Sequence, residues 1–254
     1  MIQLTSSAAF LGLAGCTSDG NGTEGGQDDT EDGGGDDMDN DEDEEEDEEE
    51  ELPEGVSEEE FETGPVPEAY MRAMSLGGEE RNPDDLSTKD EVTFSEYDEA
   101  EENSAHQPGR SCGNCADYII DRNGDGFGAC AEVEGYIDRA DWCVIYEVLP
   151  EPSVPDGMTE DELATAEVPE EYRTADSQAD EARDPENLVA QEDVSLTESV
   201  EAIADGDADP GESCGTCAEF IPDKNGDTWG ACAKVEGYIA VEDWCNIWEH
   251  VSEA

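Results

Sequence analysis

Positively charged residues are scarce in this chain of 254 residues. Ten Lys and Arg stand against 74 Asp and Glu, so the formal net charge is -64. Binding to nucleic acid needs Lys and Arg to neutralise phosphates, and this composition therefore excludes nucleic acid as a partner. In molar salt the Debye length falls to about 3 Å, so carboxylates that repel one another in dilute buffer are screened. The acidity predicts adaptation to high salt, as in halophilic archaea.

Apolar and aromatic residues are also few. Hydrophobic residues make up 35% of the chain and aromatic residues 6%, which is too little for one large core and favours two small domains. The two histidines, His106 and His250, have no partners in the repeat described below, so we expect them to be exposed. The chain has no nucleophile–base pair and no phosphate-binding loop. The sequence thus predicts a protein that is not an enzyme.

The first residues suggest export. A short apolar run ends in Leu13-Ala14-Gly15-Cys16, which resembles the lipobox of secreted lipoproteins, and the run is too short to span a bilayer. Cleavage before Cys16 and lipidation of its thiol would tether the mature protein to the outer face of the cell membrane. Residues 17–63 are mostly Gly, Asp and Glu, and we expect them to form an acidic disordered linker.

The remaining eight cysteines form two sets with the same spacing, C-x2-C-x14-C-x12-C, and the second set follows the first by 102 positions. Four thiols make a complete ligand set for a metal centre. Zinc ribbons have a second close pair of cysteines and two-cluster ferredoxins have tightly bunched ones, whereas this pattern has one pair and two singles. The sets are Cys112, Cys115, Cys130 and Cys143, and Cys214, Cys217, Cys232 and Cys245.

The fourth cysteine of each set follows a tryptophan and precedes an aromatic residue by three positions. With this ending, each repeat resembles the high-potential iron-sulfur proteins, although Asp141 and Asp243 stand where that family usually has glycine. The resemblance implies one 4Fe-4S cluster on each set of cysteines, two clusters in all. It implies small, irregular α+β domains dominated by the metal centre, loop-rich with short helices and short strands, in two tandem copies.

A buried cluster needs a shell that excludes water, and aromatic residues recur near both cysteine sets. In the resembled family a tyrosine on an N-terminal helix reaches the cluster, and a proline before Tyr70 and Tyr172 predicts a short helix at each. The candidate pocket aromatics are Tyr70, Tyr118, Phe127, Trp142 and Tyr146 in the first repeat, and Tyr172, Phe220, Trp229, Trp244 and Trp248 in the second.

Matching segments upstream of the cysteines, such as Val66-Pro67-Glu68 and Val168-Pro169-Glu170, extend both repeats, and a proline-rich stretch from Leu149 marks the boundary between them. The sequence predicts a signal and lipobox segment at 1–16, the acidic linker at 17–63, a first domain at 64–150, a linker at 151–165 and a second domain at 166–254.

Other interpretations of the motifs remain open. Eight cysteines in an exported protein can form disulfides, and four thiols bind zinc as well as iron, so the alternative is a disulfide-bridged or zinc-stabilised secreted binding module without redox function. Each Cys-Gly-x-Cys pair is similar to the thioredoxin motif, but no βαβ pattern surrounds it. The run from Asp121 to Gly126, followed by Glu132, fits a calcium-loop formula, although Asp, Asn and Gly in a row are typical of a polar turn.

Together these features predict a one-electron carrier with two high-potential 4Fe-4S clusters. We expect it to be extracytoplasmic and lipid-anchored, and to serve a respiratory-type electron transfer chain between a membrane-bound donor and an acceptor. Burial disfavours the more negative oxidation states of a cluster, which predicts a positive potential. A cluster protein must fold before export, so we expect a twin-arginine signal upstream of Met1.

Overall fold

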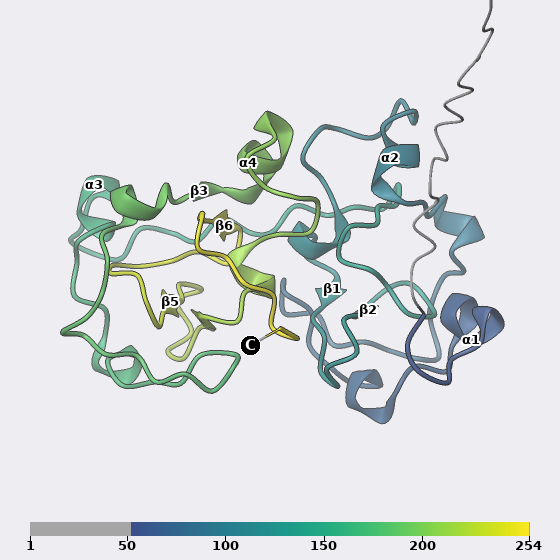
Figure 1. Cartoon of the computed structure of the whole chain (residues 1–254), viewed down its shortest axis with the longest axis horizontal. Coiled ribbons are helices and arrows are strands. Elements are labelled where there is room, and N and C mark those ends of the chain that lie inside the picture. Colours follow the sequence, from purple (N-terminus) through teal and green to yellow (C-terminus); the bar gives the residue numbers. More distant parts are fainter. Residues whose placement is uncertain (1–51, 254) are drawn as a thin grey trace, which may run out of the picture. The chain divides into compact units, whose positions relative to one another are not determined.

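The computed structural model describes residues 52–253. The lipobox at Cys16 and the linker up to residue 51 lie outside the described residues. Long loops join very short elements, with no helix longer than seven residues and no strand longer than two among the described residues (Figure 1). This confirms the expected small, irregular, loop-rich architecture. No helix in this part of the chain is long and apolar enough to cross a membrane.

The elements fall into two series. Those of the first repeat are α1 (Glu58–Thr63), η1 (Glu68–Tyr70), η2 (Asp90–Val92), α2 (Tyr97–Ala100), η3 (Cys112–Asn114), β1 (Tyr118–Ile119) and β2 (Ala129–Cys130). Those of the second are α3 (Glu160–Leu163), η4 (Glu170–Tyr172), η5 (Gln191–Val194), β3 (Thr197–Glu198), α4 (Ser199–Asp205), η6 (Cys214–Thr216), β4 (Phe220–Ile221), β5 (Ala231–Cys232) and β6 (Asp243–Trp244).

Three two-stranded antiparallel sheets are present among the described residues: β1 with β2, β4 with β5, and β3 with β6. In β1–β2 the residue Tyr118 faces Cys130, and in β4–β5 the residue Phe220 faces Cys232. These pairs are 102 positions apart. The hairpins therefore hold the third cysteine of each set beside a buried aromatic residue.

Each repeat has two groups of buried apolar side chains. In the first repeat, one group surrounds Phe61 and Tyr70 and the other contains the four cysteines. In the second repeat, one group surrounds Leu163 and Tyr172 and the other contains the remaining four cysteines. Half of each small core is thus built around thiols.

Two helices lie in segments that the sequence analysis assigned to linkers. α1 falls within 17–63 and α3 within 151–165, so neither linker extends as far as expected. Both helices begin with a capping box, formed by Ser57 with Glu60 and by Thr159 with Glu162. The caps provide hydrogen-bond partners for backbone N–H groups at the start of each helix, which would otherwise have none within the helix.

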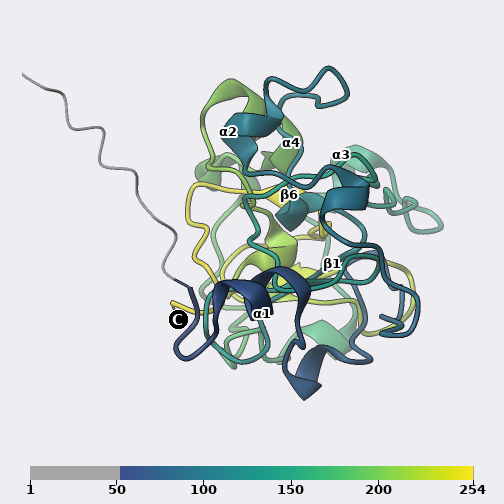
Figure 2. The ribbon, with the colours of Figure 1, turned by 90° about the vertical axis from the view of Figure 1, so that its right-hand side faces the viewer.

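Each of these helices is also anchored by one apolar residue. Phe61 of α1 stacks on Tyr136, with ring centroids 5.8 Å apart, and the Tyr136 N–H donates to the Phe61 carbonyl. Figure 2 shows the ribbon with α1 facing the viewer. Leu163 of α3 is buried, and its carbonyl accepts from the Tyr238 N–H at 3.1 Å. Both helices therefore belong to the folded repeats rather than to linkers.

Candidate functional site

All eight cysteines of the two sets are buried and free of disulfides. Each set of four lies within one apolar group, with Tyr118 and Val133 in the first repeat and Phe220 and Val235 in the second. The structure thus brings together the four thiols of each predicted set. Their role as ligands remains a prediction.

Burial raises the pKa of every one of these thiols, and nearby thiolates or carboxylates raise it further. The pKa reaches about 12 at Cys115 and Cys232 and about 11 at Cys143 and Cys245. Metal binding needs thiolates, so the positive charge of iron would have to offset this cost. Four buried thiols of this kind are a donor set that fits an iron-sulfur cluster.

Backbone amides point at some of the sulfur atoms. The Glu132 N–H donates to the Cys130 Sγ at 3.4 Å and the Glu147 N–H donates to the Cys115 Sγ at 3.4 Å. In the second repeat, the Lys234 N–H donates to the Cys232 Sγ at 3.4 Å. Such hydrogen bonds stabilise negative charge on a ligand sulfur.

A buried arginine supports the third cysteine of each set. Arg81 Nη1 donates to the Cys130 carbonyl and, at 2.8 Å, to the Val133 carbonyl. Arg183 makes the same two bonds to Cys232 and Val235. The sequence analysis missed these residues, although a matched arginine pair is a signal in a chain with so few basic residues.

The first cysteine of each set begins a 3-10 turn, η3 or η6, and the second cysteine follows that turn directly. Ser111 precedes η3, and its N–H donates to the Asn114 side chain at 3.1 Å. Ser213 precedes η6 in the same way, and its N–H donates to the Thr216 hydroxyl at 3.1 Å. Each turn is therefore closed by a hydrogen bond to one of its own side chains.

These two turns contact each other. The Gly211 N–H donates to the Ser111 hydroxyl at 2.8 Å, and the Ser213 hydroxyl donates to the Gly113 carbonyl at 2.8 Å. A Cβ at Gly113 would overlap the Gly211 backbone. The turns that carry Cys112 and Cys214 thus meet at a close contact that the sequence did not predict.

The predicted pocket aromatics lie in three kinds of place. Tyr118 and Phe220 lie within the cysteine groups, and Tyr146 and Trp248 pack against them. Tyr146 Oη donates to the Asn114 carbonyl at 3.0 Å, and Trp248 Nε1 donates to the Ser213 carbonyl at 2.8 Å. The aromatic residue after the fourth cysteine therefore covers the first cysteine turn in both repeats.

Four of the other predicted aromatics lie apart from the cysteine groups. Tyr70 and Phe127 belong to the group around Phe61, and Tyr172 and Trp229 belong to the group around Leu163. The expected short helices at the two tyrosines are present as the 3-10 helices η1 and η4. Their pocket role remains a prediction.

The two tryptophans that precede the fourth cysteines, Trp142 and Trp244, are also buried. The Trp142 ring contacts His106, with centroids 5.2 Å apart, and Trp244 Nε1 donates to Glu212 at 2.8 Å. Neither lies in the apolar groups that contain the thiols. Their pocket role also remains a prediction.

The expectation of exposed histidines is wrong for His250, which is 2% exposed. Its Nδ1 accepts from the Ser252 N–H at 3.3 Å, and its ring lies 5.9 Å from that of Trp248. Burial lowers the pKa of this histidine to about 4. The neutral ring therefore packs as an aromatic residue beside the second cysteine set. His106 is half-buried.

The run from Asp121 to Gly126 forms a polar turn. Asp121 Oδ1 accepts from the N–H groups of Asn123 and Gly124, and its Oδ2 accepts from Gly126. Tyr70 Oη accepts from the Arg122 N–H and donates to the Phe127 carbonyl, so it anchors the turn from within the core. These carboxylate oxygens are already engaged in closing the turn.

Within residues 52–253, no group of three or more His, Cys, Asp or Glu side chains is arranged to hold a single metal ion. A four-iron cluster is several atoms across, so its four ligands stand farther apart than those of one ion. That finding therefore concerns a single ion and not a cluster.

No curated protein matches this chain, and no solved structure matches it. A family model, High potential iron-sulfur protein, matches residues 177–252, which include Cys214, Cys217, Cys232 and Cys245. The match supports membership of that family for this one domain, and the family implies a 4Fe-4S cluster and electron transfer.

Proposed function

We propose that the chain is a one-electron carrier with two 4Fe-4S clusters, and that it has no enzymatic activity. The observation that carries this proposal is the grouping of eight buried, free thiols into two sets of four. The first cluster would be held by Cys112, Cys115, Cys130 and Cys143, and the second by Cys214, Cys217, Cys232 and Cys245.

A bound 4Fe-4S cluster supplies one-electron exchange between two oxidation states. The protein's own part is to bind the iron through thiolates, to keep water out and to hold the cysteine loops in place. Burial of the thiols disfavours a large negative charge, which favours the less negative pair of oxidation states and a positive potential.

Electron exchange between the two clusters is part of the proposal. Support comes from the contact between η3 and η6, where two reciprocal hydrogen bonds join the turns of Cys112 and Cys214. Leu76 packs against the first cysteine group, and a Cβ built on Gly215 in the second repeat would lie 3.0 Å from its side chain. The two sites are thus linked by packed side chains.

We further propose that the protein is extracytoplasmic and anchored to the outer face of the cell membrane through lipidated Cys16. There it would carry electrons from a membrane-bound donor to an acceptor in a respiratory-type chain, at the high salt indicated by its net charge of -64. The acidic stretch after Cys16 would give the folded part its distance from the membrane.

The test is the visible absorption spectrum of protein purified without oxygen, recorded before and after a mild oxidant and a reductant, with assays of iron and sulfide. We expect reversible changes and about eight irons per chain. About four irons would leave one cluster only. A colourless protein that contains zinc, or one without free thiols after denaturation and metal removal, would replace this function with the binding-module alternative.

A further inference from the structure

The two cysteine sites differ in charge at one position beside a ligand sulfur. Glu132 and Lys234 are 102 positions apart, and each donates its backbone N–H at 3.4 Å to the sulfur of the third cysteine, Cys130 or Cys232. Their side chains therefore start from the same place relative to the two sites. The first site has an anion there and the second a cation.

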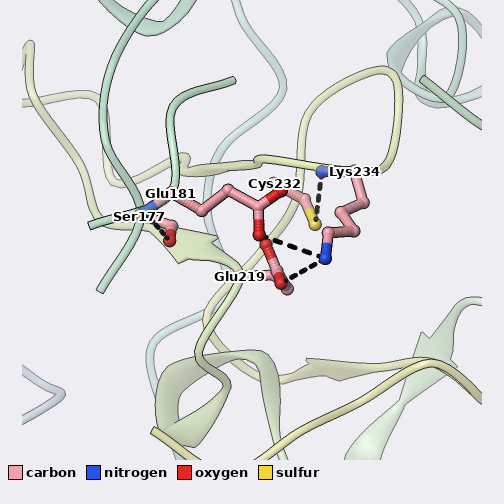
Figure 3. A network of polar contacts seen from close by, with 5 residues as sticks. All are labelled: Ser177, Glu181, Glu219, Cys232 and Lys234. Carbon is pink, nitrogen blue, oxygen red and sulfur yellow. Dashed lines mark hydrogen bonds and ion pairs between the residues drawn. The ribbon is translucent and has the colours of Figure 1, made fainter. Parts of the chain in front are cut away.

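In the second repeat, the cation joins an ion network (Figure 3). Lys234 Nζ lies 2.7 Å from Glu219 Oε1 and 3.1 Å from Glu181 Oε2. The Glu219 side chain is only 6% exposed, and Glu219 comes two positions after the ligand Cys217. Lys234 thus places its charge against a buried carboxylate within the site.

In the first repeat, the same three places are all acidic. Asp117 corresponds to Glu219, Glu79 to Glu181 and Glu132 to Lys234. None of the three forms an ion pair with a basic residue of the described chain. The first site thus lies in a more negative environment.

Other basic residues lie beside both sites. Arg81 and Arg183 make the same contacts. Arg110 lies 5.1 Å from the ring of Tyr146, and Arg139 lies 5.6 Å from the ring of the corresponding Trp248.

One more basic residue, Lys89, has no charged counterpart. It pairs with Glu62 at 3.6 Å, and the corresponding residues, Gln191 and Ala164, are both neutral. The pair and its counterparts therefore carry the same net charge. At the place beside the third cysteine, the exchange of Glu132 for Lys234 makes a difference of two charges.

We infer that Lys234 makes the second cysteine site the one with the higher reduction potential, so that an electron on the chain resides there in preference to the first site. The inference rests on the proposed function. Its physical basis is that reduction adds one negative charge, which a nearby cation stabilises and a nearby anion opposes. The carrier would then have a built-in direction, from the first repeat to the second.

The test is a redox titration of the full chain, followed by visible absorbance, with charge reversals at the two positions. We expect two one-electron steps in the unchanged protein. Lys234→Glu should lower the upper step by about 59 mV or more, a roughly tenfold change in the distribution of the electron between the sites. Glu132→Lys should raise the lower step, and the double variant should reverse the order of the sites.

Lys224→Glu is the matched control. It makes the same change of two charges in the same repeat, but Lys224 is exposed on the turn of the second repeat that corresponds to the polar turn at Asp121, and its backbone N–H donates to the Tyr172 hydroxyl. We expect its effect to be less than about a third of that of Lys234→Glu, because solvent and salt screen it. If Lys234→Glu does not assemble its second cluster, Lys234→Gln should give about half the shift.

Three results would overturn the inference while leaving two functional clusters: coincident steps, a shift of the lower step by Lys234→Glu, or equal shifts from Lys234→Glu and Lys224→Glu. Absence of iron and sulfide from the unchanged chain would instead overturn the proposed function itself. The iron assay therefore separates the two failures.

Discussion

Arg81 is a buried side chain that ties the loop after Cys130 to the segment upstream of the cysteines in the first repeat. It is 2% exposed and bonds two loop carbonyls, those of Cys130 and Val133. In Arg81→Met both carbonyls lose a buried partner. We expect a loss of about 2 kcal/mol or more of stability. That corresponds to a fall of roughly 5 °C or more in the unfolding temperature, followed by circular dichroism, with faster bleaching of the cluster.

Arg72→Met is the control, because Arg72 pairs with Glu80 at 3.0 Å on the surface, with its side chain 75% exposed. Its effect should stay within about 0.5 kcal/mol. Equal effects of the two variants would show that the buried bonds of Arg81 contribute nothing specific.

The residues of the candidate site differ in how well their positions could be predicted from the sequence. The four-cysteine spacing is a pattern that chemistry explains, so the grouped thiols could be predicted from it. Arg81 and Ser111 act through backbone atoms that are distant in sequence, and no local pattern marks such a contact. The burial of His250 could not be predicted, because it depends on packing against Trp248 in the folded chain and no sequence pattern marks it.

At the scale of elements, α1 tests whether the acidic stretch before residue 64 is part of the fold. Phe61 is 7% exposed, and its ring contacts both Phe127 and Tyr136. Phe61→Ala should cost about 3 kcal/mol, because it leaves a cavity between these rings. We expect a lower midpoint of chemical unfolding and faster proteolysis before residue 64.

Glu58→Gln, on the exposed side of the same helix, should change the midpoint very little. Unchanged stability in Phe61→Ala would return this segment to the linker.

The contact between η3 and η6 can be tested by adding one carbon. In Gly113→Ala the new Cβ would overlap the Gly211 backbone, and the two turns must move apart. We expect weaker magnetic coupling between the oxidised clusters in electron paramagnetic resonance, at unchanged iron content. Ser213→Ala removes one hydrogen bond without adding bulk, so its effect should be smaller. Identical coupling in both variants and the unchanged protein would contradict a close approach of the sites.

Elements were predictable where a local signal exists. The proline-led helices at Tyr70 and Tyr172 were expected, and they are present as η1 and η4. The capping boxes of Ser57 and Thr159 are also visible in the sequence, but the acidic residues around them led us to assign both segments to linkers. Two-residue strands such as β1 and β2 are too short to show alternation, so their pairing is set by the tertiary fold.

For the whole molecule, we expect folding to depend on metal bound by the cysteine groups. Half of each repeat's core consists of residues packed around four thiols, and regular secondary structure is sparse. Removing iron with a chelator under denaturing conditions and then diluting the protein should give a largely unfolded chain, because binding supplies much of the folding free energy. Native circular dichroism in the iron-free protein would contradict this. Restoring iron and sulfide should restore the spectrum.

The net charge of -64 predicts that folding also depends on salt. The few ion pairs among the described residues involve only four basic side chains, so most carboxylates of the folded part repel one another without a basic partner. Compaction brings these charges together, and salt screens the repulsion. Stability should therefore rise steeply between about 0.1 M and 2 M potassium chloride, as the Debye length falls from about 10 Å to below 3 Å. Cluster absorbance and circular dichroism should rise together along this series. A neutral osmolyte at equal osmolality should not replace the salt, because it does not screen charge. Stability independent of salt would contradict adaptation to a saline environment.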